Sequence, residues 1–172
     1  MKRKGFMSIE MLLVIGILVG GLAAVFLVYK KIQANLASTA IVTDIATIMN
    51  GLDRYKGAVG GYPAASATST LLSTSATFTF NAGSAYIDAG TANKWSYATV
   101  NMSTEDVDTK TSTGQIVITP DMNQYNALKT TEIVDILRGK CINGTRQIGE
   151  TVAISADSQA CVIYNNAILF ND

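Results

Sequence analysis

The fold of this chain is decided by residues 4–31, KGFMSIEMLLVIGILVGGLAAVFLVYKK. Within this stretch, residues 11–29 carry no charge and are nearly all apolar. As an α-helix rising about 1.5 Å per residue they span about 28 Å, close to the thickness of the hydrocarbon core of a bilayer. The sequence therefore predicts a membrane-spanning helix near the start of the chain.

The basic residues before this helix, Lys2, Arg3 and Lys4, suit either a secretory signal peptide or a signal anchor. A signal peptide has an apolar core of roughly 7–15 residues and then a small-residue cleavage site. Here the apolar run is longer, and the KKIQ that follows at residues 30–33 contains no Ala-x-Ala site. A signal anchor fits better, with the basic cluster in the cytoplasm and the bulk of the chain outside.

Glu10 stands at the start of the apolar run, directly after Phe6, Met7, Ser8 and Ile9. A carboxylate at membrane depth is costly and marks a functional site by default. The alternative is a carboxylate at the headgroup boundary that reaches towards water. Spacing alone leaves both interpretations open.

Residues 4–10, KGFMSIE, followed by the apolar helix, resemble the class III signal of type IV pilin precursors and the related pseudopilins. In that family a prepilin peptidase cuts after the glycine and N-methylates the new first residue, and a glutamate stands at the fifth mature position. The resemblance implies a leader of residues 1–5, cleavage after Gly5, a methylated N-terminus at Phe6 and an assembly role for Glu10.

The chemistry of the new N-terminus agrees with that role. Cleavage before Phe6 creates an amino group in apolar surroundings, where an unpaired charge is expensive. The resemblance implies that Glu10 of a neighbouring subunit neutralises this charge and sets the axial register of subunits in a fibre. Removing one partner of such a buried pair costs on the order of 3–5 kcal/mol, because the other charge stays buried.

Beyond Lys31 the pattern predicts that the helix continues to residue 57. Apolar residues recur at steps of three or four, which is typical of an amphipathic helix. They are Ile32, Leu36, Ala40, Ile41, Ile45, Ile48, Leu52 and Tyr55, whereas Gln33, Asn35, Ser38, Asp44, Asn50 and Asp53 lie mostly off this stripe. Gly57, Gly60, Gly61 and Pro63 end the helix. We expect residues 6–29 in the membrane or fibre core and residues 30–57 packed on the rest of the chain.

Gly16, Gly20 and Gly21 interrupt the apolar segment with weak helix formers. They suit close helix packing in a membrane, and they also suit a segment that loosens during polymerisation. The first interpretation is favoured.

Residues 58–172, called the head below, are predicted to form an α+β domain whose antiparallel sheet lies on the long helix. Segments with alternating apolar residues are strand candidates, at residues 76–80, 95–101, 115–119, 151–155 and 161–169. Residues 121–138 are predicted to form a helix that Gly139 stops. Tyr62-Pro63 resembles a Gly-x-Tyr-Pro motif that follows the long helix in pilins.

The composition lowers the probability of an enzyme. The chain has no histidine, the commonest general acid–base and metal ligand. No catalytic constellation, cofactor motif or metal-ligand spacing is present, so we expect no catalytic residue, cofactor or metal. Without residues 1–5 the chain has 10 basic and 13 acidic residues, a net side-chain charge of about −3. No basic stripe indicates a direct nucleic-acid site.

The two cysteines, Cys141 and Cys161, enclose residues 142–160. In the exported part of an anchored chain they are predicted to form one disulfide, with two free thiols as the alternative. The acidic residues at 104–108 allow calcium binding or a solvated turn. The turn is favoured, because Lys110 follows and no glutamate closes the loop.

Two subclasses of pilin share features with this chain. The five-residue leader and Phe6 resemble type IVa pilins, but residues 6–62 lack the usual proline, and Leu27 stands at its place. The longer head, the Tyr-Pro motif and the helix before Cys141 resemble type IVb pilins, including the thin pili of conjugative plasmids.

The resemblance implies a structural subunit that polymerises with copies of itself into a helical filament. The precursor would lie in the bacterial inner membrane with its N-terminus in the cytoplasm, and the mature subunit in an extracellular pilus for adhesion, conjugation, DNA uptake or motility. Its partners would be prepilin peptidase, the platform protein and the assembly ATPase complex. The alternatives are a pseudopilin of a type II-like secretion system and an anchored extracytoplasmic enzyme or binding protein.

Overall fold

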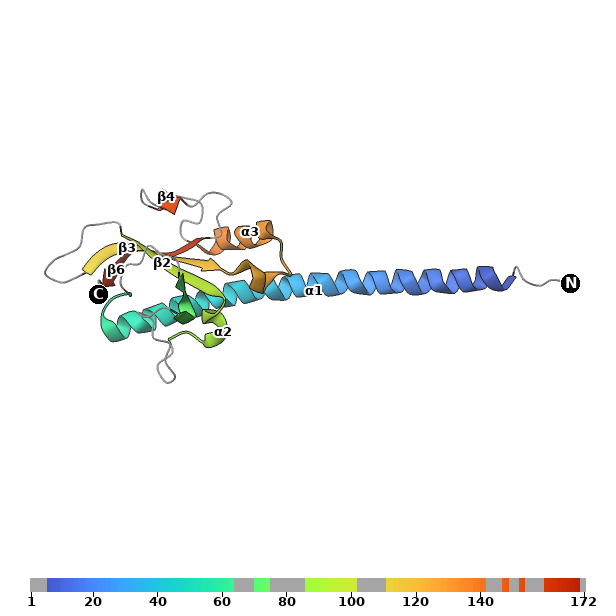
Figure 1. Cartoon of the computed structure of the whole chain (residues 1–172), viewed down its shortest axis with the longest axis horizontal. Helices are drawn as coiled ribbons and strands as arrows, with labels where there is room; N and C mark the ends of the chain where they lie inside the picture. Colours follow the sequence, from blue (N-terminus) through green and yellow to red (C-terminus); the bar gives the residue numbers. More distant parts are fainter. Residues whose placement is uncertain are drawn as a thin grey trace.

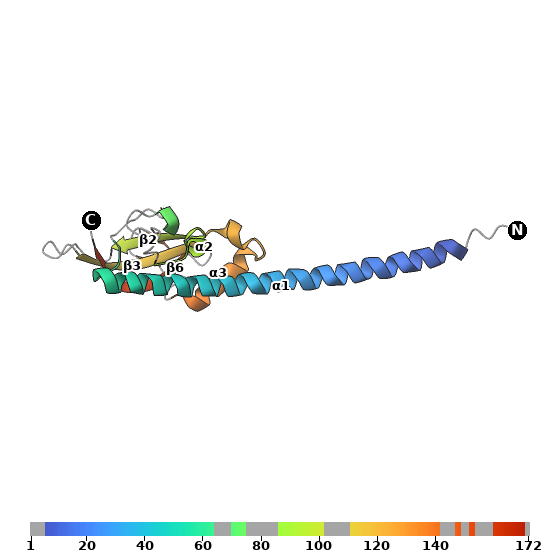
Figure 2. The same cartoon turned by 90° about the horizontal axis from the view of Figure 1, so that it is seen from below.

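The computed structural model describes residues 6–63, 70–74, 86–101, 111–141, 147–148, 152–153 and 160–170. A single helix, α1 (Phe6–Val59), runs along the molecule; the head packs on its C-terminal part, and its N-terminal part extends away from the head (Figure 1). A four-stranded antiparallel sheet lies along one side of the helix (Figure 2). The expected α+β fold is confirmed, and this arrangement is consistent with a pilin-like fold.

The helix α1 is continuous over 54 residues and contains no proline. It ends two residues later than predicted, because Gly57 keeps helical geometry. Gly60 then turns the backbone at φ 100°, a conformation that glycine adopts without a Cβ penalty. Its N–H donates to the carbonyl oxygen of Lys56 at 2.7 Å and so caps the last turn.

The main sheet has the order β1-β2-β3-β6, with every neighbouring pair antiparallel. Its strands are β1 (Thr70–Leu71), β2 (Trp95–Asn101), β3 (Thr111–Pro120) and β6 (Cys161–Phe170), and β4 (Gln147–Ile148) pairs with β5 (Val152–Ala153) apart from it. The short helices η1 (Leu72–Thr74) and α2 (Ala89–Ala92) lie between β1 and β2 in the chain. The predicted bounds of β2 are confirmed, and β3 and β6 contain their predicted segments. The predicted strand at residues 76–80 lies outside the described residues.

The segment after α1 attaches the end of the helix to the sheet. Tyr62 pairs in parallel with Leu169 of β6. Its N–H donates to the carbonyl oxygen of Ile168 at 2.9 Å, and its carbonyl oxygen accepts from the N–H of Phe170 at 3.1 Å. Tyr62 and Pro63 are both buried, so the Tyr-Pro motif forms a contact between the end of α1 and the edge strand β6.

The prediction of one helix over residues 121–138 is wrong. The structure has a 3-10 helix, η2 (Met122–Tyr125), and a separate α-helix, α3 (Thr130–Lys140). Each has its own side-chain cap: Asp121 accepts from the N–H of Asn123 at 3.0 Å, and Glu132 accepts from the N–H of Lys129 at 2.8 Å. Such local bonds compete with a continuous helical ladder.

Gly139 does not stop α3, which continues to Lys140. The last helical bond is donated by the N–H of Cys141 to the carbonyl oxygen of Leu137 at 2.8 Å. The extended backbone of Cys141, at φ −94° and ψ 146°, ends the helix.

The core lies between α1 and the sheet. It includes fewer residues of the predicted apolar stripe of α1 than expected. Ile41, Ile45, Ile48 and Leu52 are buried, together with Trp95 and Tyr97 of β2, Ile116 and Ile118 of β3, and Ile133 and Leu137 of α3. Ile32 and Leu36 of the same stripe are 51% and 66% exposed. The head therefore buries α1 from Ile41 onwards; Ala34, Ala37 and Ser38 are half-buried, and residues 9–33 are exposed. The helix leaves the head in this direction (Figure 2).

We expect Gly51→Ala to lower the free energy of unfolding by about 1–3 kcal/mol, because overpacking strains a filled core. A Cβ at Gly51 would stand 2.6 Å from the carbonyl oxygen of Tyr86, a backbone atom that cannot swing away. Gly57 is the matched control, since a Cβ there meets nothing within 4 Å. Gly57→Ala should raise stability by about 1 kcal/mol through helix propensity alone. Denaturant titration of the detergent-solubilised chain, followed by Trp95 fluorescence, measures both, and a stabilising Gly51→Ala would contradict the close contact.

Candidate functional site

The predicted processing and assembly residues lie at the free end of α1. Phe6 is the first residue of the helix, and Gly5 lies outside the described residues. Glu10 is exposed one turn further on, about 51 Å along the helix axis from Asp44, the first carboxylate within the head-covered part of α1. The structure therefore keeps Glu10 well away from the head of its own chain.

The helix around Glu10 exposes apolar side chains on every side. The large apolar residues between Ile9 and Tyr29 are each 52–70% exposed. This helix is long and apolar enough to cross a membrane. A helix that is apolar all round needs cover from lipid or from other protein, because its exposed surface far exceeds what a soluble monomer tolerates.

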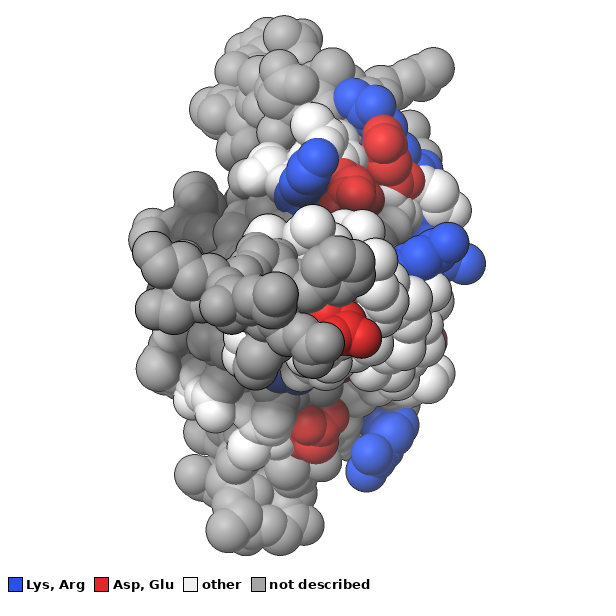
Figure 3. All heavy atoms as spheres, turned by 90° about the vertical axis from the view of Figure 1, so that its right-hand side faces the viewer, with Lys and Arg blue, Asp and Glu red and all other residues white. Residues whose placement is uncertain are grey.

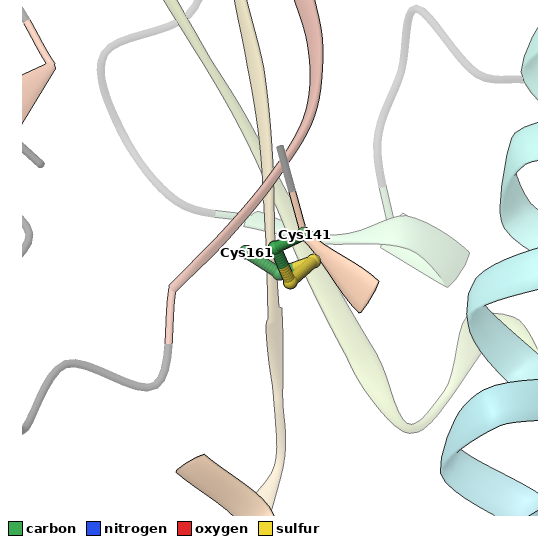
Figure 4. Close-up of a disulfide and its surroundings, with 2 residues drawn as sticks. All are labelled: Cys141 and Cys161. Carbon is green, nitrogen blue, oxygen red and sulfur yellow. A yellow bond between two sulfur atoms is a disulfide. The ribbon is translucent and has the colours of Figure 1, made fainter. Parts of the chain in front are cut away.

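The predicted disulfide is present and joins α3 to the sheet. Cys141 directly follows α3 and Cys161 begins β6, with their Cα atoms 5.2 Å apart (Figure 4). Cys161 is fully buried. The bond closes the loop of residues 142–160, of which the structure describes 147–148, 152–153 and 160.

Sequence reasoning missed a buried carboxylate on α1. Asp44 was placed off the apolar stripe, but it is only 7% exposed. Its Oδ2 accepts from the Tyr125 hydroxyl at 2.6 Å, and that hydroxyl in turn accepts from the Trp95 indole N–H at 2.8 Å. Thr91 donates to Oδ1 at 3.3 Å, and the Lys94 ammonium lies 3.7 Å from Oδ2. The spacing of Asp44 in the sequence indicates burial, because this residue stands three residues after Ile41 and four before Ile48, and residues at these steps share one helix face.

A second carboxylate on α1, Asp53, binds two tyrosines from the sheet side. Its Oδ1 accepts from the Tyr164 hydroxyl of β6 at 2.7 Å and from the Tyr62 hydroxyl at 2.9 Å. The two rings also contact each other, with centroids 4.9 Å apart. No local pattern predicts this group, because the two tyrosines stand 9 and 111 positions away from Asp53 in the chain.

Burial and the hydrogen bond to Asp53 raise the pKa of Tyr62 to about 12. Burial and the hydrogen bond to Asp44 likewise raise the pKa of Tyr125, and burial and Asp53 raise that of Tyr164. The folded state therefore favours the neutral phenols, which remain donors to the two carboxylates.

We expect alkali to destabilise the head between pH 10 and 12. Unfolded tyrosine ionises near pH 10 while folded Tyr62 stays neutral, so its contribution is fully present below about pH 10 and is lost as the pH rises through about 12. The loss from Tyr62 alone is about 2 kcal/mol. Denaturant titrations at several pH values in this range measure the free energy of unfolding. The control is Tyr62→Phe, whose free energy of unfolding should decline less steeply with pH. Equal slopes for both proteins would contradict the raised pKa.

Some charged side chains of the described head form ion pairs. Arg138 of α3 lies 3.3 Å from Asp135, and Lys94 lies near Asp44. Seen along α1 from its N-terminal side, basic and acidic side chains are interspersed (Figure 3). A hollow of about 260 Å³ beside α3 is lined by Thr130, Thr131, Val134, Asp135 and Arg138, so its two charged residues are the pair just described.

Among the described residues, no group of three or more Cys, Asp or Glu side chains is placed to hold a metal ion. The acidic residues Glu105, Asp106 and Asp108 lie outside the described part of the chain. The features that bear on function are thus the uncovered apolar helix with Glu10 and the disulfide-closed head. No protein-family model, curated protein or solved structure matches this chain.

Proposed function

We propose that this chain is the precursor of a type IV pilin, a structural subunit without enzymatic activity. Prepilin peptidase cleaves it after Gly5 and methylates Phe6. The platform protein and the assembly ATPase complex then move the subunit from the inner membrane into a helical, extracellular homopolymer. The filament serves adhesion, conjugation, DNA uptake or motility.

One observation carries this proposal: a continuous helix projects from the head with its apolar surface exposed all round. The large apolar residues from Ile9 to Tyr29 have no cover within the described chain. Lipid covers such a helix in the membrane, and helices of neighbouring subunits cover it in a fibre. A subunit that moves from lipid to the helices of neighbouring subunits needs an apolar surface that suits both surroundings.

The position of Glu10 supports the same proposal. Residues 9–33 of α1 are all exposed, so none of the described head residues of the same chain reaches Glu10. Its partner is therefore sought on another molecule. The methylated amino group of a neighbouring Phe6 is a cation that arises only after cleavage, which ties pairing to processing.

The pseudopilin of a type II-like secretion system would share the cleavage and the helix. The disulfide between Cys141 and Cys161 favours the pilin, because it closes a loop at the C-terminal end of the head, as pilins commonly do. An anchored enzyme or binding protein would need neither cleavage after Gly5 nor a carboxylate at Glu10.

The test is N-terminal sequencing and intact-mass measurement of protein sheared from cells. We expect a chain that starts at methylated Phe6 and whose mass is two hydrogens below that of the reduced form. A Gly5→Leu variant is the control, because it should retain residues 1–5 and stay in the membrane. A sheared protein that begins at Met1, or the recovery of Gly5→Leu in filaments, would overturn the proposal.

A further inference from the structure

Two carboxylates on α1 flank its buried apolar stripe on opposite sides. Each residue of an α-helix is rotated by about 100° about the helix axis from the one before it. Seen down this axis, Asp44 therefore lies about 60° to one side of Ile41, and Asp53 lies about 120° to the other side. The two are about 14 Å apart along the helix axis. Each therefore meets a different part of the head.

On the first side, Asp44 is bound by groups from α2, from the start of β2 and from η2. The contacts form a chain: the Trp95 indole donates to the Tyr125 hydroxyl, which donates to Asp44. All three residues are buried. Because hydrogen bonds weaken steeply away from their preferred angle, this chain holds only over a narrow rotation of α1.

On the second side, Asp53 is bound by groups from β6 and from the segment after α1. Tyr164 and Tyr62 donate to the same oxygen, and Tyr62 is itself fixed to β6 by two backbone hydrogen bonds. Rolling the head about α1 in either direction would stretch the contacts at one carboxylate or the other. The aliphatic stripe between them has no such directional preference, because apolar burial is non-directional.

We propose that Asp44 and Asp53 are positioning residues that together fix the rotation of the head about α1. Neither belongs to the site around Glu10. Because α1 is one unbroken helix from Phe6 to Val59, the angle at the head also sets the direction in which Glu10 points relative to the head. In the fibre, whose existence rests on the proposed function, Glu10 and the head must meet neighbouring subunits at the same time. If the rotation of the head about α1 is fixed before assembly, the same subunit geometry satisfies the contacts of Glu10 and the contacts of the head.

The rotation is measured by distances between two spin labels on the full chain in detergent micelles. The labels are placed through unnatural amino acids at Gln33 and Gln124, both exposed, so that the disulfide stays intact. We expect one narrow distance distribution in the parent protein. Asp44→Ala and Asp53→Ala should each broaden it, and the double variant should at least double its width. Asp53→Asn should keep the narrow distribution, because the amide oxygen still accepts from both tyrosines.

Asp135→Ala is the matched control, since it removes a carboxylate that is 72% exposed and pairs within α3. It should leave the distribution narrow. If Asp44→Ala fails to fold, Tyr125→Phe replaces it, because it removes the donor and leaves the carboxylate in place. A narrow, parent-like distribution in a folded double variant would overturn the proposal.

Assembly gives the second readout. The Asp44→Ala/Asp53→Ala variant should yield far less sheared fibre per membrane-inserted subunit than Asp135→Ala, while cleavage after Gly5 is unchanged. Broadened distances with undiminished fibre yield would overturn the link between rotation and assembly. If even the parent chain forms no fibre, the proposed function fails, while the label distances still decide whether the two carboxylates fix the rotation.

Discussion

The Glu10→Ala variant should be cleaved after Gly5 and inserted in the membrane, yet yield no filament. Under the proposed function, the carboxylate of the parent protein neutralises the methylated amino group of a neighbouring Phe6. Without it that cation is left unpaired in the apolar fibre core, at a cost of about 3–5 kcal/mol for every subunit added. Since each addition meets the same penalty, elongation stops. Immunoblots of sheared and membrane fractions, with N-terminal sequencing of the membrane form, measure assembly and processing separately.

Two variants of the same residue distinguish charge from shape. Glu10→Gln keeps the volume and loses the charge, so it should fail to assemble like alanine. Glu10→Asp keeps the charge on a shorter side chain and should retain some filament. Parental filament yield from Glu10→Gln would show that the carboxylate does not pair with the amino group.

Removing the disulfide should have the largest effect on stability. Replacing Cys141 and Cys161 together by serine should lower the free energy of unfolding by about 3 kcal/mol, because the bond closes a loop of about 20 residues in the unfolded chain. The buried position of Cys161 adds the cost of a hydroxyl in the core. Denaturant midpoints of the double variant and of the reduced parent chain should shift together, and by more than the Gly51→Ala shift.

The double substitution avoids a lone thiol that would cross-link two molecules. Cys161 belongs to the buried core and Cys141 packs against it, but neither lies within α1 or α3, so the variant should keep its helix content by circular dichroism. An unchanged midpoint would mean that the loop is held equally well by other contacts.

The parts of the fold that sequence reasoning predicted are those with a local periodic signal. The helix α1 follows from an uninterrupted apolar run and a stripe at helical spacing, and β2 follows from the alternation of Trp95 and Tyr97 with small residues. The break between η2 and α3 was missed because it depends on two side-chain caps rather than on hydrophobic spacing.

The polar contacts between α1 and the head were less predictable. Asp44 has the spacing of a core residue, but its charge assigned it to the surface, and only the fold supplies Tyr125 and Trp95 as partners. Asp53 depends on Tyr164, a residue brought close by the pairing of β6 with β3. The disulfide was predicted because the chain has two cysteines, both in the segment expected to be exported, and two cysteines allow only one pair.

The placement of β6 has a consequence for the order of events during synthesis. Tyr164 of β6 binds Asp53 of α1, although the two residues are 111 positions apart in the sequence. The strand β6 is also the antiparallel neighbour of β3. Contacts this distant in the chain form late in folding. While the ribosome is still making the residues before Cys161, α1 is already available for insertion, but β3 lacks its neighbour and the disulfide lacks its second sulfur. The head therefore closes only after β6 has been synthesised, and the half-finished sheet is the stage at which a chaperone or an oxidant would act.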